Sequence, residues 1–155
     1  FPTSDYEKLF AHARAEGIPF TIHAGEAAGP ESIRQAVDYG TARIGHGINC
    51  IHDKNLMNII AEKGITLELC PTSNLNTKIV NDIKDYPIDK IINNKIKATI
   101  NTDNMTVSGT DEASEMKLIC DTFGYDGNMR RIFVNNAIDA AFLSNEMKEK
   151  LRGNL

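Results

Sequence analysis

The chain has 155 residues, of which 41% are hydrophobic and 25% charged, with a formal net charge of −4. This composition is typical of an ordinary globular protein, and we expect residues 1–155 to form a single segment. The mild acidity and the absence of a Lys/Arg run exclude the electrostatic footprint of a nucleic-acid-binding protein. No apolar stretch approaches the ~20 residues that a membrane span needs.

The use of cysteine and the search for a signal peptide bear on the cellular compartment of the protein. Cys50, Cys70 and Cys120 are odd in number, widely spaced and free of any C-x-x-C pair. This usage favours reduced, buried thiols over disulfides or a zinc knuckle. No signal peptide is recognisable. We therefore expect a cytoplasmic protein that has neither nucleic acid nor a membrane as its partner.

Short apolar runs alternate with helical patterns along the chain. A capping box at Ser4 begins a helix that ends at Gly17, and a helix beginning at Pro30 ends at Gly40. Further helices are predicted from Asp53 to Gly64, around residues 88–92, from Asp111 to Phe123, and as two helices over 128–152 with Ser144 as the last cap. Strands are predicted at residues 18–22, 42–45, 66–70 and 97–102, and a loop rich in Pro, Ser and Asn is predicted after the third strand.

This alternation predicts βαβ units and a parallel sheet. Two architectures are open at this point: a small doubly wound sheet, or part of a (β/α)₈ barrel. A doubly wound sheet would carry a glycine-rich phosphate loop after its first strand, where this chain has His-Ala-Gly-Glu at 23–26. A complete barrel needs eight strands and about 250 residues. Half of a barrel is therefore the better interpretation.

Polar residues follow the predicted strands where ligands and catalytic groups gather in parallel α/β proteins. His23 and Glu26 follow the first strand, His46 the second and Asp103 the fourth. Imidazole and carboxylate ligands suit a catalytic Zn²⁺, which normally takes at least three protein groups. Glu26 could act as a proton shuttle, and His46 could assist a metal-activated water. The pattern predicts a metal-assisted hydrolytic site that is incomplete in this chain.

The other titratable residues have simpler interpretations. His12 is expected to be a solvent-facing helical residue, and His52 a structural residue near a helix start. Asp111 and Glu112 are expected to complement the dipole of the helix that they begin.

Four motifs, taken together, resemble those of the adenosine deaminase family. They are Thr21–Glu26 (TIHAGE), Arg43–Gly47 (RIGHG), Leu67–Asn74 (LELCPTSN) and Asn101–Asp103 (NTD). They occur in the order of the family and at close to its spacings, and the resemblance covers essentially all 155 residues. It implies an α/β fold that is the C-terminal half of a (β/α)₈ barrel, strands five to eight with their helices, followed by C-terminal helices.

The resemblance also implies zinc-dependent hydrolysis of adenosine, and of 2′-deoxyadenosine, to inosine and ammonia in purine salvage. His23 and Asp103 would be zinc ligands, and Glu26 would protonate purine N1. His46 would assist formation of the hydroxide and stabilise the tetrahedral adduct. The first-strand His-x-His of the family has no counterpart here, so one Zn²⁺ per complete site would need two ligands from a missing N-terminal half-barrel.

Two positions bear on the substrate. The family commonly has an aspartate where this chain has Asn104, and the resemblance implies that this residue meets purine N7, an acceptor. An asparagine NH₂ donates at any pH, whereas an aspartate must first be protonated. Adenine (free-base) deaminases tend to carry Asp at the position of Gly45, so the glycine favours a nucleoside substrate.

Two alternatives to adenosine deamination are left open by the sequence. One is an adenine deaminase, and the other is a catalytically silent half-barrel that acts as a binding or assembly module. Under the leading interpretation, the isolated chain would be inactive. Its unpaired sheet edges and uncovered apolar faces predict self-association, as in a two-fold dimer of four-stranded sheets.

Overall fold

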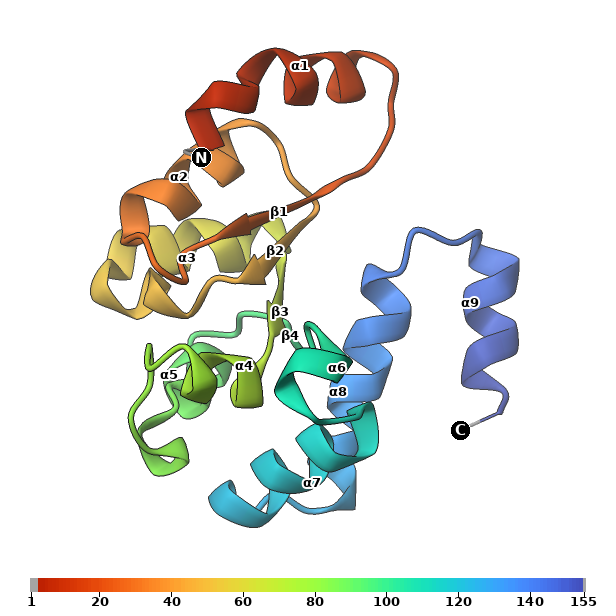
Figure 1. Cartoon of the computed structure of the whole chain (residues 1–155). Helices are drawn as coiled ribbons and strands as arrows, with labels where there is room; N and C mark the ends of the chain where they lie inside the picture. Colours follow the sequence, from red (N-terminus) through yellow and green to blue (C-terminus); the bar gives the residue numbers. More distant parts are fainter. Residues whose placement is uncertain (1–2, 155) are drawn as a thin grey trace.

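The computed structural model describes residues 3–154 and contains one parallel sheet (Figure 1). Its strands are β1 (Thr21–Ala24), β2 (Arg43–His46), β3 (Thr66–Leu69) and β4 (Ala98–Ile100), and they lie in the order β1-β2-β3-β4. In the register of the first pair, His23 lies beside Gly45 and Ala24 beside His46. Because every neighbouring pair is parallel, all the carboxyl ends meet at one edge of the sheet.

Helices separate the strands and complete the chain. They are α1 (Glu7–Ala15), α2 (Pro30–Asp38), α3 (Lys54–Lys63), α4 (Pro71–Asn76), α5 (Ile88–Asn93), α6 (Met105–Ser108), α7 (Glu112–Phe123), α8 (Gly127–Ala140) and α9 (Asn145–Arg152). Short 3₁₀ helices cover Thr3–Tyr6, Ile48–His52 and Ile83–Asp85. The predicted alternation of strand and helix is confirmed.

Several predicted helix ends are confirmed by their hydrogen bonds. The Asp53 side chain accepts from the Leu56 backbone N–H, and Ser144 accepts in the same way from Met147. Gly64 ends α3 in the left-handed conformation (φ 66°), which glycine adopts without a steric penalty.

Three local predictions were wrong. Ser4 does not cap the first helix, because residues 3–6 form a 3₁₀ turn and the N-cap residue is Tyr6, without a side-chain bond. The first strand begins at Thr21 rather than Ile18, so His23 lies inside it. The expected loop after β3 contains the helix α4, with Pro71 in its first turn, where a missing N–H costs nothing.

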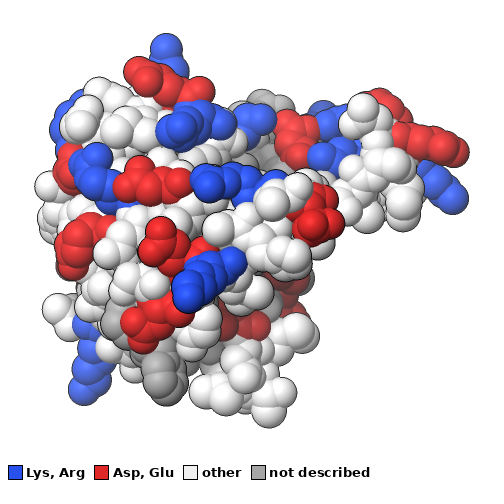
Figure 2. All heavy atoms as spheres, turned by 90° about the horizontal axis from the view of Figure 1, so that it is seen from above, with Lys and Arg blue, Asp and Glu red and all other residues white. Residues whose placement is uncertain are grey.

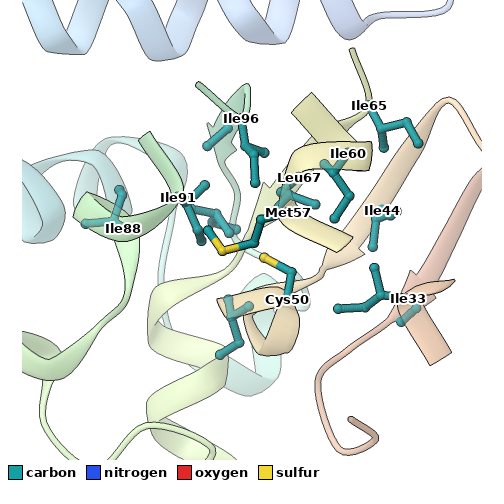
Figure 3. Close-up of a cluster of buried hydrophobic side chains, with 14 of the residues drawn as sticks. Ile33, Ile44, Cys50, Met57, Ile60, Ile65, Leu67, Ile88, Ile91 and Ile96 are labelled. Atoms are coloured by element: carbon teal, nitrogen blue, oxygen red, sulfur yellow. The ribbon is translucent and has the colours of Figure 1, made fainter. Parts of the chain in front are cut away.

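Apolar side chains of the strands meet those of the helices on one face of the sheet (Figure 3). Ile44 and Leu67 project from β2 and β3 toward Ile33 of α2 and Ile60 of α3, and all four are fully buried. Ile88 and Ile91 of α5 extend this core. Strand β4 also contacts α8, where the Asn136 side chain donates to the Ala98 carbonyl at 2.9 Å. Helices thus cover the outer face of the sheet.

The surface is mixed in charge. Figure 2 shows acidic and basic side chains interspersed over the face that it presents. Among residues 3–154, no helix combines the length and apolar character that crossing a bilayer requires. Within the same residues, β1 and β4 each pair with one neighbour only and form the two edges of the sheet.

Candidate active site

A tight turn after β1 brings Glu26 back over the strand that carries His23. Gly25 makes this turn with a φ of 69°, and a Cβ at this position would clash with the Ile33 side chain. Only glycine combines that backbone angle with that space. The turn places Glu26 Oε2 3.3 Å from His23 Nε2.

His46, the last residue of β2, completes a three-residue cluster. Its Nε2 lies 3.6 Å from Glu26 Oε2, and the His23 and His46 rings are 4.2 Å apart between centroids. One ligand atom from each of His23, Glu26 and His46 falls within 4.8 Å of the others. Two imidazoles and a carboxylate are donors that Zn²⁺ accepts. The structure therefore brings together three of the residues singled out in the sequence.

Asp103 approaches the cluster from the other edge of the sheet. Its Oδ2 lies 4.0 Å from His46 Nε2 and accepts a hydrogen bond from Ser73 Oγ at 2.8 Å. It does not belong to the 4.8 Å group that includes Glu26. The carboxylate is thus held at the site by α4, and His46 stands between it and Glu26.

His46 is buried, and of its two ring nitrogens only Nδ1 has a hydrogen-bond partner among the described residues. The residue is 1% exposed, and Asn74 Nδ2 lies 2.9 Å from its Nδ1. Within the described residues, Nε2 is buried without a hydrogen-bond partner. Burial, and then the neighbouring His23 ring, lower the pKa of His46, against the opposing effect of Glu26 and Asp103. The imidazole is therefore neutral near pH 7.

Two hollows adjoin this cluster. One of about 380 Å³ is bounded by the β1–α2 turn, including Glu26 and Ser32. A second of about 270 Å³ is bounded by His46, Cys70 and Asp103, and His23 borders both. Burial raises the pKa of the Cys70 thiol to about 12, so this thiol is neutral beside the carboxylates. A ligand that contacts His23 therefore has space in either hollow.

Asn104 and Gly45 border the site without joining the cluster. The Asn104 side-chain oxygen accepts from the Val107 N–H at 2.9 Å and caps α6. This leaves the NH₂ group as the end that can face a ligand. A Cβ at Gly45 would lie 3.5 Å from His23 Cγ, so a larger residue there would contact the His23 ring.

The remaining histidines are apart from the site, as the sequence predicted. His12 lies on α1 and His52 ends a 3₁₀ helix, and both are exposed. The sequence did not reveal the roles of Ser73, Asn74 and Tyr86. Ser73 and Asn74 belong to a recognised motif, but Tyr86 lies in a stretch with no motif, and only its fold places it 3.0 Å from Asn74.

Four parallel strands, helices on their outer face and polar residues at their carboxyl ends define half of a (β/α)₈ barrel. Solved structures share this fold. The chain superposes on a Burkholderia ambifaria amidohydrolase with bound Zn at a TM-score of 0.89 and 26% sequence identity. The superposition covers 98% of this chain and 43% of that one. An adenine deaminase from Arthrobacter aurescens gives a TM-score of 0.92 at 24% identity, covering 97% of this chain and 46% of that one.

The chain belongs to the adenosine deaminase family, because the family model described as adenosine deaminase matches residues 1–155. It is 46% identical over 151 residues to an adenosine deaminase from Haemophilus ducreyi. The aligned region covers 97% of this chain and 44% of the relative. An adenosine deaminase from Clostridium perfringens is 40% identical over 95% of this chain and 45% of its own length. The chain spans about half the length of these curated relatives.

Proposed function

We propose that this chain supplies the C-terminal half of the active site of an adenosine deaminase, which hydrolyses adenosine to inosine and ammonia. The observation that carries the proposal is the cluster of His23, Glu26 and His46 within 4.8 Å at adjacent strand ends. In a family member, such a group is a candidate for metal-assisted hydrolysis.

His23 and Asp103 are the proposed zinc ligands of this segment. The buried, unpartnered Nε2 of His46 and the donor types around it fit a polar group bound here. Zinc acts in such sites as a Lewis acid that makes water reactive near neutral pH. Two ligands are too few for a catalytic zinc. The proposal therefore includes an N-terminal half-barrel that contributes the other ligands, in line with relatives about twice as long.

Glu26 is the proposed proton donor to purine N1. A side chain in this role must reach the substrate without being committed to the metal, and Glu26 extends from a turn rather than from a strand. His46, neutral and buried, is suited to stabilise charge that develops on an oxygen added to the purine ring. Asn104 would donate its NH₂ to N7 because its oxygen is already engaged.

Adenine is the second candidate substrate, and the glycine at position 45, next to His23, is the observation that separates the two. The position contacts His23, so its side chain would alter the site directly. The absence of a side chain favours the nucleoside.

The test joins this chain to the N-terminal half of the Haemophilus ducreyi relative and measures deamination of adenosine and adenine by ammonia release. We expect adenosine to be the preferred substrate. His23→Ala should abolish turnover, and His12→Ala, the same change on an exposed helix, should leave it intact. A folded, zinc-containing chimera that deaminates neither substrate, or prefers adenine, would refute the proposal.

A further inference from the structure

A buried chain of hydrogen bonds runs from Tyr86 through Asn74 to His46. The Tyr86 hydroxyl lies 3.0 Å from Asn74 Oδ1, and Asn74 Nδ2 lies 2.9 Å from His46 Nδ1. Tyr86, Asn74 and His46 are 2%, 0% and 1% exposed. Water does not reach these side chains, so their polar atoms depend on partners within the protein.

The Glu26 carboxylate determines which way the Asn74 amide points. Asn74 Nδ2 lies 3.4 Å from Glu26 Oε1 as well as 2.9 Å from His46 Nδ1. Glu26 Oε1 accepts from the Asn74 NH₂ group in this contact. Turning the amide over would set its oxygen against the carboxylate oxygen, so the NH₂ group must face Glu26. The Tyr86 hydroxyl must then donate to the amide oxygen.

This orientation fixes the proton on His46. A ring nitrogen that faces an amide N–H donor must accept, so Nδ1 carries no proton. The hydrogen of the neutral ring is then on Nε2. That nitrogen points between Glu26 Oε2 at 3.6 Å and Asp103 Oδ2 at 4.0 Å, and has no hydrogen-bond partner among the described residues.

We propose that Asn74 and Tyr86 are positioning residues that hold His46 as the Nε2–H tautomer, so that His46 presents a hydrogen-bond donor to an oxygen at the reaction centre. The consequence for catalysis is specific. His46 Nε2 can stabilise negative charge on that oxygen, but it cannot take up a proton from it. The identity of the oxygen rests on the proposed function, whereas the tautomer rests on the hydrogen bonds alone.

The tautomer is measured directly by long-range ¹H–¹⁵N correlation spectra of the chain labelled with ¹⁵N-histidine. His46→Gln assigns the signal. We expect the Nε2–H pattern in the unmodified chain. In Asn74→Asp an acceptor replaces the donor, so the His46 proton should move to Nδ1. Thr77→Val is the matched control, because Thr77 also lies 3.4 Å from Glu26 Oε1 but does not touch His46. It should leave the pattern unchanged.

An Nδ1–H pattern in the unmodified chain would overturn the proposal, and so would an unchanged pattern in Asn74→Asp. If Asn74→Asp does not fold, Tyr86→Phe provides the test. It keeps the aromatic ring and removes only the hydroxyl that donates to Asn74. We expect a smaller population of the Nε2–H tautomer. An unaltered population would count against the proposal that Tyr86 helps to hold this tautomer.

A second measurement uses the chimera with the N-terminal half. Tyr86→Phe should lower kcat about threefold to tenfold and leave KM nearly unchanged, the loss expected when one hydrogen bond supporting the transition state is weakened. A merely structural role would lower stability without this split. An inactive chimera would count against the proposed function. The tautomer measurement would then decide by itself whether Asn74 and Tyr86 hold His46 as the Nε2–H form.

Discussion

At the scale of single residues, the site combines backbone strain with side-chain restraint. His46 and Asp103 have φ angles of 60° and 57°, in the left-handed region that residues other than glycine seldom adopt. Such angles cost about 1–3 kcal/mol each and persist where the surroundings impose them. Here Asn74 holds the His46 ring and Ser73 holds the Asp103 carboxylate. Among residues 3–154, Lys78 and Lys95 also have such angles, but His46 and Asp103 are the two for which we propose roles in catalysis and metal binding.

Glu26→Gln tests the proton-donor role most cleanly. The amide preserves the size of the side chain but cannot deliver a proton, so in the active chimera kcat should fall by roughly 10²–10⁴-fold. KM should change much less, because shape and most contacts are kept. Steady-state rates with adenosine provide the measurement. A near-normal kcat would remove Glu26 from the mechanism.

Strand ends are readable from short apolar runs, so the sequence predicted that four polar residues gather at one edge of the sheet. His23, Glu26 and His46 meet as that logic required, and Asp103 lies beside His46. The supporting residues could not be found in the same way. Asn74 is 28 residues from His46 and Tyr86 is 12 from Asn74, and no periodicity brings them together. Their contacts depend on how α4 packs against the strand ends.

At the scale of elements, three helix starts were predictable, whereas the start of α1 and the helix α4 were not. Asp53, Asp111 and Ser144 begin helices through bonds to nearby backbone N–H groups, a signal contained in a few consecutive residues. Helix α4 has six residues, too few to be stable alone. Its first turn is supported from a distant helix, because Glu115 Oε2 of α7 accepts from the Thr72 backbone N–H at 3.1 Å.

Glu115→Ala should therefore destabilise the fold. The side chain is 1% exposed, and its removal leaves the Thr72 N–H without its acceptor. We expect the free energy of unfolding to fall by about 1–3 kcal/mol in urea titrations. Asp121→Ala, a carboxylate of the same helix paired with Lys117 at the surface, should change it by less than about 1 kcal/mol. Equal effects of the two substitutions would contradict this role of Glu115.

At the scale of the whole molecule, the fold is half of a closed barrel, and we propose that the site is divided in the same way. Four strands form a sheet with two edges, whereas a barrel has none. His23 lies on one edge strand and Asp103 follows the other. Closing the sheet with further strands would bring new residues next to both, which is where our proposal requires further zinc ligands.

The exposed edges lead us to expect that the 155-residue chain self-associates when it is alone. Exposed apolar side chains, including Phe142, Met147 and Leu151 of the C-terminal helical region, add to this tendency. Sedimentation velocity at micromolar concentration should show a dimer or larger species, and joining the N-terminal half of the relative should reduce it to a monomer. A stable, monodisperse monomer of the 155-residue chain would contradict the expectation.

The zinc content of the chain, alone and joined to that N-terminal half, tests the divided site most directly. Two ligands hold zinc poorly and four hold it well. After dialysis, the chain alone should retain far less than one equivalent, and the chimera about one per site. In the chimera, His23→Ala and Asp103→Ala should both release the metal, while His12→Ala should keep it. If the chain alone binds one equivalent of zinc tightly and deaminates adenosine, the zinc site is not divided between two halves, and the proposal is wrong.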